Sequence, residues 1–548
     1  MNARPDPDST PDTLAIDGAS LTVEDVVRVA GGTGTVVTLT PASRRAVAAS
    51  RELKLSLIAA GTPIYGVTTG FGDSVGRHIS PAKAAELQRN MVEFHRNGTG
   101  PSTPDDVVRA TLLVRVNCLA LGSSGVSPAV VDRLLDMIEH DILPVIPQRG
   151  SVGASGDLVP LSYVASAVVG HGTVRHRGRE TDAATVFAEL GRPPVVLEAK
   201  DALAMLNGTS FTAAWSALAL ARAARTARLA ELGTALAVQA LAGNRGPFEA
   251  FIHDQKPHPG QVASATAIRR LLHGSRLASS HTEIVERNDS LDGRGYQELS
   301  SRIQDRYSIR CAPHIVGILR DTVEWAQRWV TTEINSANDN PLFDVVNQTV
   351  HSGGNFYAGH LGQAMDALRT AVANIADLLD RQLELVVDEK FNNGLTANLI
   401  APVTAEEHDA GLHHGFKGMQ IACSSITAEA LHACMPTSVF SRSTEAHNQD
   451  KVSMAPISAR GTHTVLGLVD EVLAIHLVAM GQALDLRGAT RLSPRTAVAH
   501  RLLRERVPFA DRDRRMDNDI AAVIELISSG VLDAQAAAPT VRRSRRRT

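Results

Sequence analysis

The residues best suited to chemistry lie in short polar islands within an otherwise apolar, helix-forming sequence. One island, at residues 153–157, reads Gly-Ala-Ser-Gly-Asp and stands directly before an apolar run. Its two glycines, Gly153 and Gly156, allow a positive φ or a tight turn. Seven further islands are rich in Asn, Gln, Tyr, Arg or Gly: IYGVTTGFGDS (64–74), LNGTS (206–210), IQDRYSIR (303–310), NSANDNPLFD (335–344), GGNFYAG (353–359), GFKG (415–418) and TEAHNQDKVS (444–453). Singly, each is typical of a turn, but eight in one helical chain favour loops that converge on a site.

The familiar catalytic motifs are missing from the sequence. It has no GxxxxGK[ST] phosphate loop, no HExxH pair and no CxxC, and residues 153–157 do not spell a G-x-S-x-G nucleophile elbow. His408, His413 and His414 do not share one helix face, which favours structural or surface histidines over metal ligands. Lys417 lacks the phosphate-binding glycine loop of a pyridoxal phosphate site. We therefore expect neither a metal nor pyridoxal phosphate.

Composition excludes several classes of function. The chain has 548 residues, a formal charge of −3 and only 4% aromatic residues, so no overall field steers it towards nucleic acid or an anionic membrane. No window approaches ~20 continuous apolar residues, and the polar first residues lack a secretory signal. We therefore expect a cytoplasmic protein. Its cysteines have no paired spacing that would indicate disulfides or zinc: Cys118, Cys311, Cys423 and Cys434.

Long helices must position the islands. Residues 210–243, 360–388 and 461–488 are apolar on much of their circumference, so other helices should cover them. Thr40 before Pro41 predicts a helix start, and residues 34–40 carry a brief strand signal. The expected fold is mainly α, an elongated long-helix bundle with a loop-rich N-terminal part. We expect four regions: a disordered tail (1–20), an N-terminal domain (21–208), a long-helix bundle (209–535) and a basic disordered tail (536–548).

Together, the islands resemble those of the aromatic amino acid ammonia-lyase and aminomutase family, which contains histidine, phenylalanine and tyrosine ammonia-lyases. The resemblance runs from about residue 20 to 500, with the islands in the family's order. Its most specific element is Ala-Ser-Gly followed by Asp-Leu-x-Pro-Leu at residues 154–161. It implies the helical fumarase/aspartase-like architecture and an enzyme that is a carbon–nitrogen lyase.

The resemblance also implies a prosthetic group made from backbone. In this family the tripeptide that matches Ala154, Ser155 and Gly156 cyclises autocatalytically to 4-methylidene-imidazol-5-one (MIO). The Gly156 nitrogen would attack the Ala154 carbonyl, and loss of water would turn the Ser155 side chain into an exocyclic methylene. The product is an electrophile that ordinary side chains cannot supply. Bonding a substrate amine to it makes ammonia a better leaving group.

Further residues receive roles by the same resemblance. Tyr65 matches the base that removes the β-proton, and its pKa of ~10 in water requires a site that stabilises the phenolate. Arg310 offers a planar fork for the substrate carboxylate. Tyr307 matches a second active-site tyrosine. The other matched positions bind substrate or line the site: Asn207, Gln304, Asn340, Phe356, Lys417, Glu445, Asn448 and Gln449.

A few residues indicate which substrate side chain the site would accept. Histidine-specific relatives carry a glutamate where this chain has Gln449, and this pattern favours phenylalanine or tyrosine. The selectivity pair is Phe94–His95. Phe94 offers an apolar wall, and His95 could accept from or donate to a phenolic hydroxyl. We expect elimination of ammonia from L-tyrosine and/or L-phenylalanine to give coumarate or cinnamate.

Alternatives remain open at this point. An aromatic amino acid 2,3-aminomutase would use the same site and return the amine to the β-carbon, and a histidine ammonia-lyase would differ in substrate. A fumarase/aspartase-like enzyme without the prosthetic group would need a flexible Ser-Ser loop, for which the chain has no convincing counterpart. An inactive helical scaffold would not need intact Tyr65, Ser155 and Arg310. The resemblance also implies a homotetramer with shared active sites, which the long apolar helices would suit.

Overall fold

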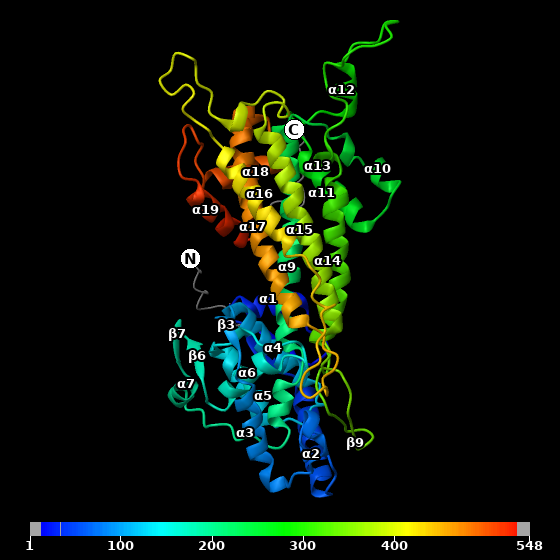
Figure 1. The fold of residues 1–548 in the computed structure, drawn as a ribbon, viewed down its shortest axis with the longest axis vertical. Helices are drawn as coiled ribbons and strands as arrows, with labels where there is room; N and C mark the ends of the chain where they lie inside the picture. Colours follow the sequence, from blue (N-terminus) through cyan, green and yellow to red (C-terminus); the bar gives the residue numbers. More distant parts are fainter. Residues whose placement is uncertain (1–11, 33, 534–548) are drawn as a thin grey trace, which may run out of the picture. The chain divides into compact units, whose positions relative to one another are not determined.

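The computed structural model describes residues 12–32 and 34–533. Helices make up 57% of it, which confirms the mainly helical fold class. The chain forms two compact units, each assembled from separated stretches. Of the described residues, the first contains those of 12–221, 325–366 and 436–463, and the second contains those of 222–324, 367–435 and 464–533. Figure 1 shows both, coloured along the sequence.

The first unit combines short helices with small sheets. Its complete helices of six residues or more are α1 (Val23–Ala30), α2 (Pro41–Ala59), α3 (Ala84–His95), α4 (Asp105–Ala120), α5 (Pro128–Glu139), α6 (Leu158–Val168), α7 (Ala183–Glu189) and α8 (Asp201–Leu206). Its strands are β1 (Thr13–Ile16), β2 (Val36–Leu39), β3 (Thr99–Ser102), β4 (Leu143–Pro144), β5 (Pro147–Arg149), β6 (Thr173–His176), β7 (Arg179–Asp182), β8 (Leu342–Asp344) and β9 (Thr349–His351). β1 pairs with β2 in parallel, β3 with β5, β8 with β9, and β4, β6 and β7 form a three-stranded sheet.

Local sequence signals explain several of these elements. The Thr40 hydroxyl accepts a hydrogen bond from the Ser43 amide at 3.2 Å, and Pro41 is the first residue of α2, as its sequence predicted. The strand signal at 34–40 becomes β2. In contrast, α4 is buried from Val107 to Ala120 apart from Arg109. A helix covered all round in this way forms the core of the unit.

The second unit is built from long helices and their connections. Four long helices run from one unit into the other: α9 (Ser210–Ala240), α14 (Ala312–Ile334), α15 (Gly359–Val387) and α17 (Ala455–Arg487). The helices that lie wholly within the second unit are α10 (Ala250–Asp254), α11 (Pro259–Leu272), α12 (His281–Glu286), α13 (Tyr307–Arg310), α16 (Lys417–His432), α18 (Pro494–Arg504) and α19 (Asp517–Ser528).

Within the second unit, parts of α9, α15 and α17 run side by side (Figure 1). The amide of Gln382 on α15 donates to the Thr234 hydroxyl on α9 at 3.0 Å. His476 on α17 is fully buried, and a Cβ on Gly233 of α9 would meet its ring. Gly233 therefore permits the close packing of these helices.

Two expectations about organisation need correction. Residues 13–16 of the predicted tail (1–20) form β1, because their backbone pairs with Val36–Leu39; residues 1–11 lie outside the described part. The predicted boundary at 208/209 is not the structural one, since α9 continues the first unit to Ala221, and later stretches return to that unit. The basic tail at 536–548 lies outside the described residues.

Helix α17 is the one described helix that is long and apolar enough to cross a membrane. However, 78% of its apolar window is buried inside the structure. Such burial is typical of the core helix of a soluble protein, and it explains the apolar sequence without a membrane. The four cysteines are unbridged.

Candidate active site

A cavity of about 430 Å³ lies in the first unit and collects most of the predicted site residues. Six of the eight islands reach it. The predicted residues in its lining are Tyr65, Phe94, His95, Ala154, Ser155, Asn207, Asn340, Phe356, Glu445, Asn448 and Gln449. Met91, Leu158 and Leu203 also line it and were not singled out from the sequence. Loops that are far apart in the sequence thus meet at one partly apolar cavity.

The Ala154–Ser155–Gly156 loop is held in an unusual backbone conformation. Ser155 has φ 51° and Gly156 has φ 78°, both in the left-handed region that ordinary residues rarely adopt. The Asp157 amide donates to the Gly208 carbonyl at 2.7 Å, and the Gly208 amide donates to the Ser155 carbonyl at 3.3 Å. The loop before α6 is therefore fixed against the start of α9.

The side chain of Asp157 also holds this loop in place. Its buried carboxylate accepts hydrogen bonds from the Thr212 amide at 2.8 Å and the Thr212 hydroxyl at 2.6 Å. Burial raises the pKa of Asp157 to about 7, although the bonds from Thr212 act in the opposite direction. Asp157 was not predicted as a site residue, although it follows Gly156 directly as the aspartate of the Ala-Ser-Gly-Asp-Leu motif.

Two asparagines line the same cavity as the loop. Asn207 Nδ2 donates to the Asn340 carbonyl at 2.9 Å, and Asn340 Oδ1 accepts from the Gly353 amide at 2.7 Å. The buried Arg115 donates to the Asn207 carbonyl at 3.2 Å. Among the described residues, Asn207 Oδ1 is buried without a hydrogen-bond partner. An unsatisfied buried oxygen at the edge of a cavity is typical of a group that awaits a ligand.

A buried ion pair stiffens this part of the site. Lys200 Nζ lies 2.7 Å from Asp339 Oδ2, and both side chains are completely buried. Burial lowers the pKa of Lys200, and the Asp339 carboxylate opposes that effect. Asp339 directly precedes Asn340, so the pair helps to fix this asparagine. This ion pair could not be predicted, because nothing in the sequence indicates that residues 139 positions apart are in contact.

Tyr65 presents its phenol to the same cavity. Its oxygen accepts a hydrogen bond from the Gly72 amide at 2.9 Å. Burial raises the pKa of Tyr65, the Gly72 amide lowers it, and the negative charge of Glu445 raises it. The net effect is a raised pKa, so the phenolate stabilisation expected from the sequence comes from the Gly72 amide alone and is outweighed.

The Phe94–His95 pair forms an aromatic wall. Phe71 and Phe94 are stacked with ring centroids 5.8 Å apart, and the Phe94 and His95 centroids are 4.0 Å apart. His95 Nδ1 lies 2.8 Å from the Met91 carbonyl. Because a carbonyl only accepts, Nδ1 carries the proton and Nε2 of the neutral ring is an acceptor. Burial lowers the pKa of His95, which favours that neutral form.

Four predicted site residues belong to the other unit: Gln304, Tyr307, Arg310 and Lys417. Within the described part of the chain, the lining of the cavity includes none of them. Gln304 and Arg310 line a separate cavity of about 590 Å³ in the second unit. The Tyr307 side chain is exposed, with the Arg310 guanidinium 4.5 Å from its ring centroid. Lys417 is exposed at the start of α16.

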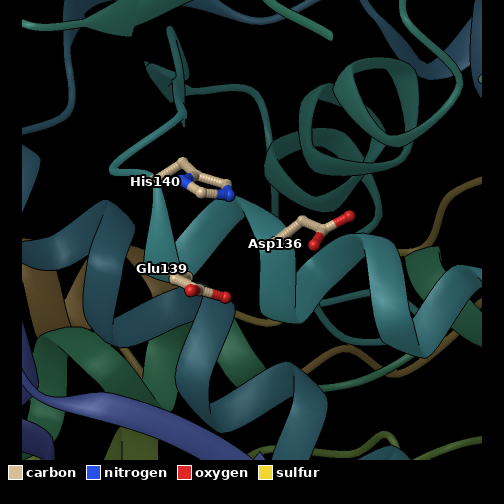
Figure 2. Close-up of side chains that lie close together, drawn as sticks. All are labelled: Asp136, Glu139 and His140. Carbon is tan, nitrogen blue, oxygen red and sulfur yellow. The ribbon is translucent and has the colours of Figure 1, made fainter. Parts of the chain in front are cut away.

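A different cluster has the composition of a metal site. Figure 2 shows Asp136, Glu139 and His140 around the end of α5. One possible ligand atom of each lies within 4.8 Å of those of the other two. However, Asp136 already pairs with Arg192 at 2.9 Å and with Arg133 at 3.9 Å. These two arginines neutralise the carboxylate that would hold a cation, and the cluster lies outside the lining of the cavity.

Comparison with known proteins agrees with the geometry. The family model described as aromatic amino acid lyase matches residues 21–505. The chain is 38% identical over 522 residues to an MIO-dependent tyrosine 2,3-aminomutase of Streptomyces globisporus (94% of this chain, 95% of the relative). It is 37% identical over 519 residues to a histidine ammonia-lyase of Stigmatella aurantiaca (95% and 97%).

A third relative and a solved structure extend this comparison. The chain is 38% identical over 521 residues to a tyrosine ammonia-lyase of Cupriavidus metallidurans (94% of this chain, 96% of the relative). The crystal structure of tyrosine aminomutase from Streptomyces globisporus superposes with a TM-score of 0.91 at 36% identity, covering 96% of this chain and 98% of the other. The fold is accordingly the helical fumarase/aspartase-like one.

Proposed function

Because the chain belongs to the aromatic amino acid lyase family, we propose that it eliminates ammonia from L-tyrosine and/or L-phenylalanine, giving coumarate or cinnamate. The observation that carries this proposal is the cavity itself. It brings Tyr65, the Ala154–Gly156 loop and an aromatic wall together in one unit. The reaction needs three parts: a base, an electrophilic group formed from the loop and an apolar surface for the substrate ring.

The residues at the loop suit an MIO group. Ala154 and Ser155 line the cavity, and Gly156 follows them directly in the chain. Asn207, whose Oδ1 has no hydrogen-bond partner among the described residues, belongs to the same lining. Asn207 and Asn340 would hold the group. When formed, it supplies an electrophile that turns the substrate amine into a better leaving group.

Tyr65 supplies the base in this proposal. As phenolate it takes the proton from Cβ, and the electron pair of that C–H bond forms the Cα=Cβ double bond. The Cα–N bond breaks with its electron pair staying on nitrogen, so the protonated amine departs as ammonia. The Gly72 amide, 2.9 Å from the phenolic oxygen, holds the negative charge of the phenolate before the proton arrives. Such a positioned base typically contributes about 10²–10⁴-fold to the rate.

The aromatic side chains of the cavity support the proposed choice of substrate. Phe71, Phe94 and Phe356 offer apolar surface for a substrate ring. His95 Nε2, left as an acceptor by the bond at Nδ1, suits the hydroxyl of a phenol. Gln449 is neutral where histidine-specific relatives carry a glutamate, which favours a phenyl or phenol ring over imidazole.

The second unit supplies the remaining binding groups in a homotetramer. We infer that Gln304, Tyr307 and Arg310 reach the cavity of a neighbouring subunit, where Arg310 pairs with the substrate carboxylate. Lys417 belongs to the same shared arrangement. The exposed Tyr307 ring, with the Arg310 guanidinium lying over it, supports this assignment. We place the enzyme in the cytoplasm.

A second candidate function is a tyrosine or phenylalanine 2,3-aminomutase. The specific observation in its favour is the likeness to the Streptomyces globisporus tyrosine aminomutase in both sequence and fold. In this alternative the same residues remove ammonia, and the amine then returns to the β-carbon before the aryl acrylate leaves.

One experiment separates these functions. Purified protein is incubated with L-tyrosine, L-phenylalanine or L-histidine, and the aryl acrylate and the β-amino acid are followed separately. A lyase accumulates the acrylate, and a mutase accumulates the β-amino acid. Turnover of L-histidine alone would contradict the substrate assignment, and no product from any of the three would contradict the proposed function.

A further inference from the structure

We propose that Glu445 is a positioning residue that ties the loop carrying the Tyr65 base to segment 444–449 and so holds the Gly72 amide against the phenol. This role rests on the proposed function, in which Tyr65 is the base. It assigns to Glu445 a task within the protein that differs from direct binding of substrate.

Both oxygens of the Glu445 carboxylate are engaged by the chain itself. Oε1 accepts a hydrogen bond from the Asp73 amide at 2.8 Å, and Oε2 accepts one from Asn448 Nδ2 at 2.9 Å. Asp73 and Glu445 are 372 positions apart in the sequence. One carboxylate thus joins two distant segments that line the same cavity.

The tie acts on the residue that contacts the base. Gly72 precedes Asp73, and its amide donates to the Tyr65 phenol at 2.9 Å. Gly72 has φ 62°, and a Cβ at this position would overlap the Glu445 carboxylate. The carboxylate therefore packs directly on Gly72 and fixes the next amide, which leaves the Gly72 N–H little freedom to turn away from Tyr65.

Segment 444–449 is shaped to aim this carboxylate. Glu445, Ala446 and His447 all have positive φ, at 51°, 52° and 64°, a conformation that non-glycine residues rarely adopt even singly. The turn is closed by reciprocal backbone bonds between Thr444 and Gln449 at 3.0 and 3.2 Å. Strained turns that the surroundings hold in place are characteristic of functional sites.

Glu445 acts on the base in two opposing ways. By fixing the Gly72 amide it stabilises the phenolate, whereas its negative charge raises the pKa of Tyr65. The other titratable groups in the cavity lining are His95, Tyr357, Asp450 and Lys451, and Asp73 adjoins Gly72. Replacing Glu445 by Gln removes the charge but keeps an oxygen for the Asp73 amide, while Ala removes both.

The test uses the full-length protein without substrate. The chain has five tyrosines, so uniform labelling with 3-fluorotyrosine gives five ¹⁹F resonances, and Tyr65→Phe identifies the one from Tyr65. We expect that resonance to titrate at lower pH in Glu445→Gln than in the parent protein. An unchanged or higher midpoint would overturn the role of the charge.

Hydrogen exchange tests the tie itself. In Glu445→Ala the amides of Gly72 and Asp73 should exchange faster than in the parent, whereas Glu445→Gln should keep most of their protection. Asn448→Ala leaves the hydrogen bond from the Asp73 amide to Glu445 in place, so its amide protection should lie between those of Glu445→Ala and Glu445→Gln. This variant replaces Glu445→Ala if the latter fails to fold. Equal protection in Glu445→Ala and the parent would overturn the tie.

Kinetics complete the test, with Glu52→Gln as the matched control. Glu52 is exposed, forms an ion pair with the neighbouring Arg51 and is not in the cavity lining, so its replacement should change none of the three readouts. A misplaced base should lower kcat in Glu445→Ala by about tenfold to a hundredfold, with a smaller change in KM. A rise in KM alone would identify a substrate ligand instead. The NMR and exchange results are independent of turnover, so they remain decisive even if none of the amino acids is a substrate.

Discussion

Gly156 and Gly208 lie against each other so closely that a Cβ on Gly156 would overlap the carbonyl oxygen of Gly208. This contact, with the hydrogen bond from the Asp157 amide to the same carbonyl at 2.7 Å, fixes the loop that would cyclise.

Replacing Gly156 by Ala should therefore displace the loop and abolish turnover while leaving the helical fold intact. Activity with each substrate and far-ultraviolet circular dichroism measure the two outcomes. Gly178→Ala is the matched control, because Gly178 also has a positive φ but faces open space. Full activity in Gly156→Ala would show that the contact does not shape the site.

The raised pKa of Tyr65 predicts an alkaline dependence of rate. Its base form is the phenolate, so kcat/KM should rise with pH through the alkaline range, because burial and Glu445 keep the phenol protonated at lower pH. Tyr65→Phe should lower kcat by about 10²–10⁴-fold in the alkaline range and remove the rise with pH. A pH–rate profile for both proteins checks this. A rate that is flat from neutral to alkaline pH in the parent would contradict the role of Tyr65.

His95 should favour the phenol of tyrosine. Its Nδ1 proton is committed to the Met91 carbonyl, and the neutral ring leaves Nε2 as an acceptor. In His95→Phe, kcat/KM for L-tyrosine should fall about tenfold or more relative to L-phenylalanine, since the hydroxyl then lacks a partner. His171→Phe, an exposed histidine outside the cavity, should leave the ratio unchanged. An unchanged ratio in His95→Phe would place phenol recognition elsewhere.

Asp157 should make stability depend on pH. Its pKa is about 7 when folded against an ordinary 3.8, so folding favours the protonated form. Its contribution is complete below about pH 4 and is lost as pH rises to about 7. Asp157→Asn cannot titrate. Its unfolding free energy relative to the parent should therefore increase over this range, by up to about 4 kcal/mol.

Denaturant unfolding at several pH values measures this difference. Asp132→Asn, a change at a surface carboxylate paired with Arg44, serves as the control and should show no such trend. A constant difference between Asp157→Asn and the parent from pH 4 to 7 would mean that Asp157 is ionised throughout.

The sequence was sufficient for the helical class because that information is local. Long Ala- and Leu-rich stretches without proline became α9, α15 and α17, and Thr40 capped α2 as expected. The arrangement into two units was not predictable in this way. Those long helices each pass from one unit to the other, and no change in composition marks the crossing points.

The residues of the candidate site fall into the same two groups: those marked by local sequence, and those whose role depends on distant contacts. Tyr65 and Ser155 could be identified because they sit in motifs that are specific over a few residues. Arg115 and Lys200 could not, because each looks like an ordinary surface residue until its burial and its distant partner are known. The direction of the Tyr65 pKa likewise depends on Glu445, which is distant in sequence.

The central claim is that Ala154, Ser155 and Gly156 close into a ring, and mass spectrometry of the peptide that contains them tests it most directly. In freshly purified, folded protein that peptide should be lighter than its encoded mass by the water lost in ring closure and dehydration, and Ser155→Ala should abolish the ring. A peptide of full encoded mass from the unaltered protein would contradict the account.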